Sequence, residues 1–486
     1  MKSYKLFING RWINSVSGKT FKSFDPSNGK PVAEFQEGND KDIEIAVQAA
    51  EKAFPSWRDT PAPVRGDILF KISALLMQNK EALAKLVTQE MGKVLNEAKG
   101  DVQEAIDIFE YIAGEGRRLF GNTVPSELKD KFCMTVRRPL GVFGLITPWN
   151  FPIAIPCWKL APALLCGNTV VFKPSSDTPL CATRLVEILT EAGIPLGVVN
   201  LVTGPGDTAG TALIRHPRVR GISFTGSRDT GKFIVENAGL KKIGLELGGK
   251  NPIIIMDDAD LDLALEGVLW GGFGTTGQRC TAASRVIIHK KVKDQFEKML
   301  LQRVKKLKLG NGLKKETDIG PLVNKKALEK VHNYTEIGKK EGANLLCGGK
   351  PVNMPGFFYE PTIFTDVKPN MRIAQEEIFG PTVSIIPVND FEEAIQVANN
   401  VSYGLSSSIY TKDIRKAFIA MDKIDAGLTY INSSTIGSEA HLPFGGVKQS
   451  GNGAREAGIL GIDEFSEIKT VYVDYSGRLQ KAQGVK

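Results

Sequence analysis

Short apolar runs alternate with segments of helical periodicity from about residue 132 onward, and this alternation limits the possible folds of the chain more than any other feature. The apolar runs predict strands over 142–147, 169–173, 198–203, 219–224 and 253–256. Helices fit between them, for example over 180–192 and 208–215. Strands that alternate with helices form βαβ units, which build parallel sheets covered by helices. The sequence therefore predicts an α/β fold with a doubly wound sheet.

The N-terminal part of the chain shows a different pattern. The apolar runs 5–8 and 11–13 are separated by Asn9 and Gly10, a pair that is typical of a tight hairpin. Asp40 is predicted to cap a helix, because apolar residues follow it at helical spacing. Further helices are expected over 65–79, 81–92 and 97–119.

A second α/β stretch runs from about 260 to 430, with loops expected at 348–351 and 353–356. Residues 132–137 and 468–475 each alternate like a strand, and the chain ends in a polar tail. No Ser- or Gly-rich linker separates the two α/β stretches.

Composition excludes several classes of protein. The 486 residues include 62 Lys and Arg against 54 Asp and Glu, and the charge of +8 is spread in short runs, so we expect no nucleic-acid partner. No uninterrupted apolar run is long enough to span a bilayer and no apolar leader follows Met1, so we expect no membrane partner and a cytoplasmic protein. The six cysteines form no CxxC pair and the four histidines no zinc pattern, which favours a reducing compartment and no metal site.

Two glycine-rich turns follow predicted strands. Residues 204–210 contain three glycines without the GxGxxG spacing of a dinucleotide site. Residues 224–233 lead from a strand into a helix, so their backbone N–H groups would point at an anion. This second turn nearly matches a P-loop, but Phe233 stands where a P-loop needs a magnesium-binding hydroxyl, which opposes an NTPase. An ordinary strand–helix turn is the alternative.

Cys280 directly follows a glycine-rich segment, 271–277, and two polar residues. A lone cysteine is usually a small buried hydrophobe. So many glycines are unusual in a core, however, and they let the backbone approach a ligand closely. The adjacent Arg279 would stabilise a thiolate only if its side chain turns toward the sulfur.

Glu246 and Asn150 are the other two candidates for chemistry. Glu246 lies between two leucines at a strand end, where burial would raise its pKa toward that of a general base. Asn150 lies among aromatic residues and prolines in 147–152, where its amide would serve a developing oxyanion. The alternatives are a surface glutamate and a plain Asx turn.

Together these segments resemble the NAD(P)-dependent aldehyde dehydrogenase superfamily over essentially the whole chain. The matching segments are, in order, TPWNFP (147–152), FKP (172–174), FTGS (224–227), LELGGKNP (245–252), GQRC (277–280), EEIFGP (376–381) and PFGGVKQSG (443–451). The resemblance implies an aldehyde dehydrogenase-like α/β fold, with a doubly wound cofactor domain, an α/β catalytic domain and a small β oligomerisation flap.

The resemblance also implies roles for individual residues. Cys280 would be the nucleophile, forming a thiohemiacetal and then a thioester, and the Asn150 amide would hold the oxyanion. Glu246 would activate the water that hydrolyses the thioester to a carboxylic acid. The residues implied in binding NADP or NAD are Lys173 at the adenosine ribose, Gly226 and Ser227 at the pyrophosphate, Glu377 and Phe379 at the nicotinamide ribose, and Trp149 in the cofactor cleft.

One position bears on the choice between the two cofactors. Members of the superfamily that prefer NAD often carry Glu three residues after the lysine equivalent to Lys173, and here that position is Ser176. A serine does not repel a 2′-phosphate, and Lys173 would attract it. We expect NADP to be accepted, with a preference for NAD as the alternative.

The expected substrate is a small aldehyde, and the chain looks most like bacterial and archaeal semialdehyde dehydrogenases of the 2,5-dioxopentanoate type through 150–164 and 281–285. Trp158 and Gly274 stand where succinic semialdehyde enzymes carry arginines, so that carboxylate clamp is expected to be absent. The predicted pocket consists of Trp158, Phe273, Ser438, His441 and Phe444, and His441 would bind a polar tail, with a surface histidine of no function as the alternative. The alternatives are an apolar tunnel, with Trp270 in its wall, for a medium-chain or aromatic aldehyde, and a CoA-acylating enzyme, which Glu246 opposes.

The expected domain division follows from the resemblance. The dinucleotide-binding domain would comprise 1–120 and 140–248, and the catalytic domain 249–449. Residues 121–139 and 450–486 would form the oligomerisation segment of a homodimer or homotetramer.

Overall fold

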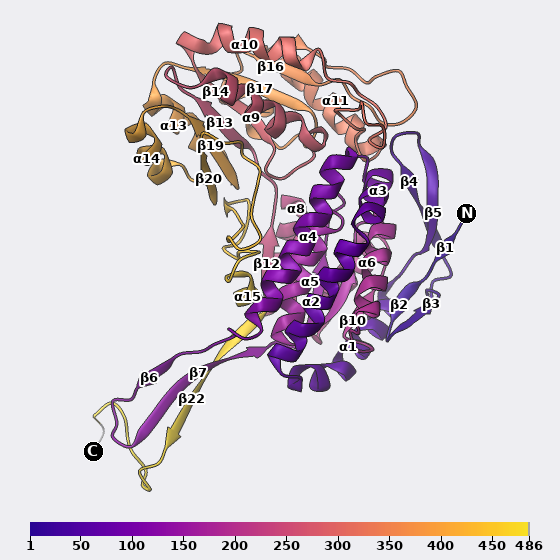
Figure 1. The fold of residues 1–486 in the computed structure, drawn as a ribbon, viewed down its shortest axis with the longest axis vertical. Helices are drawn as coiled ribbons and strands as arrows, with labels where there is room; N and C mark the ends of the chain where they lie inside the picture. The colour runs from indigo at the N-terminus through magenta and orange to yellow at the C-terminus, as the bar shows by residue number, and fades with distance from the viewer. Residues whose placement is uncertain (485–486) are drawn as a thin grey trace.

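The computed structural model describes residues 1–484, and its main body contains two seven-stranded sheets (Figure 1). The first sheet has the order β12 (Lys242–Glu246), β11 (Val219–Thr225), β8 (Val142–Ile146), β9 (Thr169–Lys173), β10 (Val199–Leu201), β2 (Leu6–Ile8) and β3 (Arg11–Ile13). The strands from β12 to β10 are parallel, whereas β2 and β3 add an antiparallel edge. The predicted parallel α/β sheet is confirmed.

The hairpin that forms this edge is also confirmed. Asn9 and Gly10 both have positive φ, 51° and 74°, which is the conformation of a two-residue turn between twisted strands. The helix that follows is α1 (Asp40–Asp59), but the predicted cap is wrong by one residue. Asn39 is the N-cap, because its side chain accepts hydrogen bonds from the backbone of Lys41 and Asp42, and Asp42 completes a capping box.

Helices cover both faces of the first sheet. One face packs against α1, α7 (Thr211–Arg215) and α8 (Arg228–Asn237), and the other against α2 (Ala62–Gln78), α4 (Leu95–Glu115), α5 (Ala154–Cys166) and α6 (Pro179–Glu191). The period of two along β8 explains the division, since Val142 and Ile146 pack on the first face and Phe143 and Leu145 on the second. The helix α3 (Lys80–Met91) contacts α4 and α6, and one π-turn, Gly206–Gly210, precedes α7.

The helix α5 is an element that the strand and helix patterns did not predict. Its residues form an apolar run interrupted by Lys159, with Pro156 in the first turn and Pro162 further along, and every residue in it is buried. A helix that is apolar all round lies in the centre of a fold, and it shows no amphipathic period for a sequence pattern to detect. Residues 1–484 contain no helix that combines the length and apolarity needed to cross a bilayer.

The second sheet has the order β15 (Asn344–Cys347), β16 (Thr362–Thr365), β17 (Thr382–Val388), β14 (Ala283–His289), β13 (Asn251–Ile255), β19 (Ser406–Tyr410) and β20 (Leu428–Ile431). All of its strands except β15 are parallel. One face is covered by α9 (Leu261–Phe273) and α10 (Lys290–Val304), and the other by α11 (Lys325–Lys340), α12 (Arg372–Gln375), α13 (Phe391–Asn399) and α14 (Ile414–Lys423). The predicted second α/β stretch is thus confirmed.

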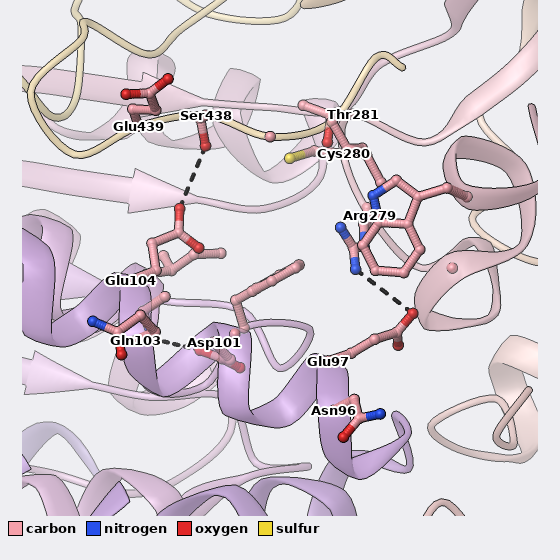
Figure 2. Close-up of a pocket in the computed structure, with 18 of the residues that line it drawn as sticks. Asn96, Glu97, Asp101, Gln103, Glu104, Arg279, Cys280, Thr281, Ser438 and Glu439 are labelled. Atoms are coloured by element: carbon pink, nitrogen blue, oxygen red, sulfur yellow. Dashed lines mark hydrogen bonds and ion pairs between the residues drawn. The ribbon is translucent and has the colours of Figure 1, made fainter. Parts of the chain in front are cut away.

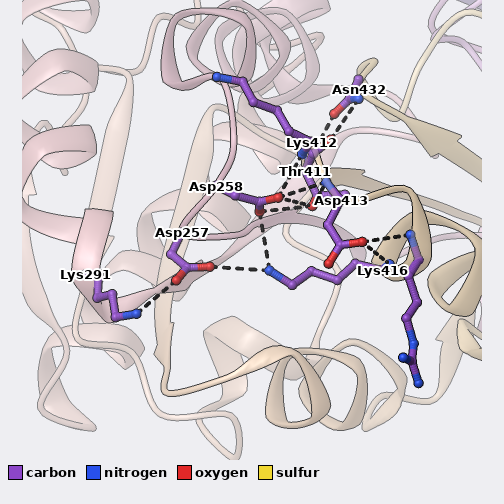
Figure 3. A network of polar contacts seen from close by, with 9 residues as sticks. Asp257, Asp258, Lys291, Thr411, Lys412, Asp413, Lys416 and Asn432 are labelled. Atoms are coloured by element: carbon purple, nitrogen blue, oxygen red, sulfur yellow. Dashed lines mark hydrogen bonds and ion pairs between the residues drawn. The ribbon is translucent and has the colours of Figure 1, made fainter.

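A polar network joins two parallel strands of this sheet at their carboxyl ends (Figure 3). Asp258, just after β13, accepts hydrogen bonds from the Thr411 hydroxyl at 2.8 Å and from the backbone of Asp413 at 2.9 Å. Lys416 of α14 lies 3.4 Å from Asp257 and 3.5 Å from Asp258. These contacts hold the start of α14 against the end of β13. The polar groups at the carboxyl ends of these two strands are therefore used to stabilise the fold.

A third, antiparallel sheet projects from the body (Figure 1). It consists of β22 (Ser466–Asp474), β7 (Lys131–Pro139) and β6 (Thr123–Pro125), so the two segments predicted as strands at 132–137 and 468–475 pair with each other. The remaining small elements are β1 (Ser3–Tyr4), β4 (Thr20–Asp25) and β5 (Lys30–Gln36) in one sheet, β18 (Tyr403–Gly404) with β21 (Val447–Lys448), and α15 (Gly461–Glu464).

Candidate active site

Strand ends from both large sheets supply the site. In the first sheet, Asn150 follows β8, Lys173 ends β9 and Glu246 ends β12, all at carboxyl ends of parallel strands. In the second sheet, Asn251 starts β13 and Cys280 lies just before β14, both at amino ends. Side chains far apart in sequence therefore meet between the sheets, at the kind of edge where α/β folds bind ligands.

A cavity of 1130 Å³ lies at this junction, and the sulfur of Cys280 points into it (Figure 2). The predicted residues that line it are Trp158, Glu246, Trp270, Phe273, Cys280, Ser438, His441 and Phe444. Asn150 is absent from the lining and is buried. The structure thus brings the predicted nucleophile, base and substrate pocket to one place.

The loop before Cys280 has a strained backbone. Thr275, Thr276 and Gly277 have φ values of 51°, 59° and 68° in succession, and non-glycine residues rarely adopt this left-handed conformation. At Gly277 a side chain is also excluded by space, since a Cβ would lie 2.1 Å from the carbonyl oxygen of Gly380. Such strain persists only where surrounding contacts hold it.

Two amide side chains that the sequence analysis did not select hold this loop. Asn251 Nδ2 donates hydrogen bonds to the carbonyl oxygens of Cys280 at 2.7 Å and Ala282 at 2.9 Å. Gln278 is fully buried, and its Oε1 accepts a hydrogen bond from Val323 N at 2.9 Å. Both residues stand inside matched segments, LELGGKNP and GQRC, which is the one sequence signal that would have identified them.

The environment of Cys280 favours the protonated thiol. Burial, followed by the negative charges of Glu377 and Glu246, raises the pKa of Cys280 to about 12. Arg279 does not offset this effect, because its side chain turns away from the sulfur toward Thr275 and Glu97. The thiolate needed for attack must therefore be generated by a base or by a bound positive charge.

Glu246 is more deeply buried than the sequence predicted, with 3% of its surface exposed. Neither carboxylate oxygen has a hydrogen-bond partner within residues 1–484. Desolvation raises the pKa of Glu246 well above its ordinary value, and the nearby carboxylate of Glu456 adds to the shift. A buried carboxyl with open acceptor positions and a raised pKa has the properties of a general base for a water molecule.

An ion pair lies close to this carboxyl. Lys159 Nζ, within the apolar helix α5, contacts the carboxylate of Glu456 directly and lies 3.0 Å from the hydroxyl of Ser223. Both charged groups are almost completely buried. The positive charge of Lys159 opposes the rise of the Glu246 pKa. The sequence analysis missed this pair, although a lysine in an otherwise apolar helix was a usable signal.

The Asn150 side chain is held in a defined orientation. Its Nδ2 donates a hydrogen bond to the carbonyl oxygen of Gln278 at 3.1 Å, two residues before the nucleophile. An amide nitrogen carries two N–H donors, so one remains for a ligand. The Asn150 amide is therefore a hydrogen-bond donor that is fixed to the loop before Cys280.

The predicted cofactor residues Lys173, Gly226 and Ser227 lie at the carboxyl ends of parallel strands of the first sheet. Lys173 is buried, which lowers its pKa to about 8, so most of it stays protonated at neutral pH. Ser227 is the N-cap of α8 and accepts a hydrogen bond from Thr230 N at 3.3 Å, which leaves backbone N–H groups of the first turn free. The adjacent Gly226 donates its N–H to Glu246 O at 3.0 Å, which ties this turn to β12.

The remaining predicted cofactor residues are Glu377, Phe379 and Trp149. Glu377 accepts a hydrogen bond from Gly249 N at 3.0 Å, and burial raises its pKa. The rings of Phe379 and Trp149 meet edge to face, with centroids 5.5 Å apart. An ammonium group, a helix N-terminus and a carboxylate match the phosphates and ribose hydroxyls of a nicotinamide dinucleotide, so the donor set fits NAD or NADP.

The substrate side combines aromatic rings and polar groups. Trp158 and Phe444 pack edge to face with centroids 4.9 Å apart. Ser438 Oγ lies 3.4 Å from the carboxyl of Glu104, and burial raises the pKa of Glu104 to about 7. His441 is exposed, and its Nε2 lies 3.5 Å from Glu439. The pocket is therefore apolar at Trp158 and Phe444 and polar around Ser438.

The fold and this arrangement of thiol, carboxyl and amide define an aldehyde dehydrogenase. The sequence model described as aldehyde dehydrogenase family matches residues 12–471, and the chain belongs to this family. Enzymes of the family use NAD or NADP, and this protein is an NAD(P)-dependent aldehyde dehydrogenase.

Individual relatives cover nearly the whole chain. An alpha-ketoglutaric semialdehyde dehydrogenase of Bacillus subtilis is 45% identical over 478 residues, which are 97% of this chain and 98% of that protein. An alpha-ketoglutarate semialdehyde dehydrogenase of Haloferax volcanii is 45% identical over 482 residues, 97% of this chain and 99% of that protein. Among solved structures, a betaine aldehyde dehydrogenase of Staphylococcus aureus in complex with NAD⁺ superposes with a TM-score of 0.96 at 38% identity, covering 100% of this chain and 97% of that chain.

Proposed function

We propose that the protein oxidises a semialdehyde to the corresponding carboxylic acid, with Cys280 as nucleophile. The observation that carries this proposal is the Cys280 sulfur, which faces a cavity whose wall also holds the buried carboxyl of Glu246. The names of the Bacillus and Haloferax relatives support a semialdehyde as the substrate.

In the proposed mechanism, the Cys280 thiol first gives its proton to a water molecule. Its Sγ then forms a bond to the aldehyde carbon, and the electron pair of the C=O π bond moves to the oxygen, which takes the negative charge. The free N–H of the Asn150 amide and the backbone N–H of Cys280 stabilise this oxyanion. NAD(P)⁺, when bound, supplies the hydride acceptor, and loss of hydride from the carbon leaves a thioester on Cys280. Glu246 then takes a proton from the attacking water, the C–S bond breaks, and the acid leaves with the thiol restored.

Three other functions are less well supported. A CoA-acylating enzyme does not need a base that activates water beside the thioester. Glu246, whose two carboxylate oxygens have no hydrogen-bond partner within residues 1–484, is such a base in our proposal and therefore opposes this function. A P-loop NTPase is opposed by Phe233, which lies in α8 and offers no hydroxyl to magnesium. A catalytically idle protein is opposed by the presence of Cys280, Glu246 and Asn150 together.

The substrate class is tested by initial rates with 2,5-dioxopentanoate and with hexanal, each with NAD⁺ and with NADP⁺, followed at 340 nm. We expect kcat/KM to be at least tenfold higher for the keto acid aldehyde, a difference of about 1.4 kcal/mol in transition-state binding. A higher value for hexanal would instead show that Trp158, Trp270 and Phe273 line an apolar tunnel.

We further propose that NADP is accepted. Ser176 Oγ donates a hydrogen bond to Gly204 O at 3.1 Å, and a serine brings no charge against a 2′-phosphate. Replacing Ser176 with Glu places a carboxylate there, and we expect the ratio of kcat/KM for NADP to that for NAD to fall about 10- to 100-fold. Ser176→Gln is the matched control, because it has a similar size without the charge. An unchanged ratio in Ser176→Glu would place the 2′-phosphate elsewhere.

The domain division and assembly are also proposals. We assign 1–120 and 140–248 to a dinucleotide-binding domain, 249–449 to a catalytic domain, and 121–139 with 450–486 to an oligomerisation segment. The projecting sheet of β6, β7 and β22 supports this role, because it exposes Phe132, Ile468 and Tyr472. The assembly would be a homodimer or homotetramer.

The six free cysteines fit a reducing, cytoplasmic location.

A further inference from the structure

Arg279, the residue before the nucleophile, extends its guanidinium into the cavity (Figure 2). The group lies over two aromatic rings, 4.6 Å from the centroid of Trp270 and 5.4 Å from that of Phe151. Its side chain is 11% exposed, so it is largely removed from water. A cation in such a position is fixed in orientation by cation–π contacts and is weakly screened.

Most of its hydrogen-bonding capacity is unused. Nε donates to the Thr275 hydroxyl at 2.8 Å, which is the one hydrogen bond of this side chain within residues 1–484. Nη2 forms an ion pair with Glu97 at 3.7 Å, which is longer than a hydrogen bond, and the Glu97 oxygens accept hydrogen bonds from Thr275 N at 2.8 and 2.9 Å. A guanidinium has five N–H donors, so its terminal nitrogens keep open donors beside the cavity.

Several other charged groups of the cavity wall have partners of their own. Asp101 pairs with Lys93 at 3.1 Å, and both side chains are completely buried. Glu104 lies beside Ser438, and its raised pKa of about 7 leaves about half of it uncharged at neutral pH. Farther out, Arg303 pairs with Glu266. Arg279 shares an ion pair with Glu97, but its terminal nitrogens donate no hydrogen bond within residues 1–484, so they remain open to a further acceptor.

We propose that Arg279 binds the carboxylate at the far end of an anionic aldehyde and thereby selects for semialdehydes. This inference rests on the proposed function, because it requires the aldehyde carbon to lie at Cys280. A planar guanidinium with two open terminal nitrogens matches a carboxylate in a bidentate contact. It would take the place of an arginine at Trp158 or Gly274, where this chain has none.

The test compares two aldehydes of equal length, 5-oxopentanoate and pentanal, which differ in the terminal carboxylate. We expect Arg279→Gln to lower the ratio of kcat/KM for 5-oxopentanoate to that for pentanal by about 10- to 100-fold, the usual size of a charge-assisted hydrogen-bond loss. Arg279→Lys should give an intermediate ratio, since it keeps the charge but loses the planar fork. Using a ratio cancels any general loss of rate from disturbing the loop.

A second readout does not depend on turnover. Titration calorimetry with glutarate, the dicarboxylate product, and with pentanoate should show that Arg279→Gln weakens glutarate binding about tenfold or more while pentanoate binding changes little. An unchanged substrate ratio together with unchanged glutarate binding would overturn the inference and leave Arg279 as a support for Thr275. If the wild type oxidised neither aldehyde, the proposed function would fail, and the glutarate titration would still decide the role of Arg279.

Discussion

Replacement of Cys280 with alanine is expected to reduce kcat by about 10⁵-fold or more, to the level of background, in the 340 nm assay. The thiol forms the covalent bond on which both halves of the proposed mechanism depend, and no other cysteine lines the cavity among the described residues. Binding of NAD or NADP, measured by fluorescence titration, should persist, because the proposed cofactor residues lie on other segments.

The control is Cys347→Ala. Cys347 is a free, partly buried cysteine in the edge strand β15 of the second sheet, so this variant removes a thiol without touching the cavity. It should retain activity within about twofold. If Cys280→Ala kept more than about one per cent of wild-type kcat, the covalent mechanism would be wrong.

Replacement of Glu246 with glutamine should separate the two halves of the reaction. A general base contributes about 10²- to 10⁴-fold, so steady-state turnover should fall by about 10³-fold. The first half does not need this base to split water, so stopped-flow absorbance should show a burst of one reduced cofactor per active site, followed by slow turnover. Glu236→Gln, an exposed change on α8, is the control.

The pH dependence of the wild type follows from the same carboxyl. Burial and Glu456 raise the pKa of Glu246, so the protonated, inactive form predominates at low pH and the base form grows as the pH rises. Hydrolysis of the thioester should therefore accelerate with increasing pH, and this rise should disappear in Glu246→Gln. A steady-state rate that remains high and pH-dependent in that variant would assign water activation to another group.

Much of the fold was predictable because its signals are local. The strand predicted at 169–173 matches β9 in full, and the Asn9-Gly10 turn has the expected positive φ values. The helix α5 was missed, since an apolar run with prolines lacks the period of an amphipathic helix. Local patterns therefore recover short buried strands and turns, but they lose a helix that is buried on all sides.

The site was predictable through its motifs but not through its contacts. Cys280, Glu246 and Asn150 were recognised from their segments. The pair of Lys159 and Glu456 joins residues 297 positions apart; a lysine in an apolar segment is a local signal, but no local pattern identifies Glu456 as its partner. The direction of the Arg279 side chain likewise depends on Trp270 and Phe151, which only the folded structure brings to it.

The pairing of β22 with β7 has a consequence for how the protein is synthesised. A hydrogen bond across this sheet joins Arg137 to Ser466, 329 residues later in the chain. Phe444 and Glu456, which complete the cavity wall, also emerge from the ribosome long after Cys280. A nascent chain therefore carries Cys280, the proposed nucleophile, without the last wall of its cavity, and the proposed site is completed only when translation is almost finished.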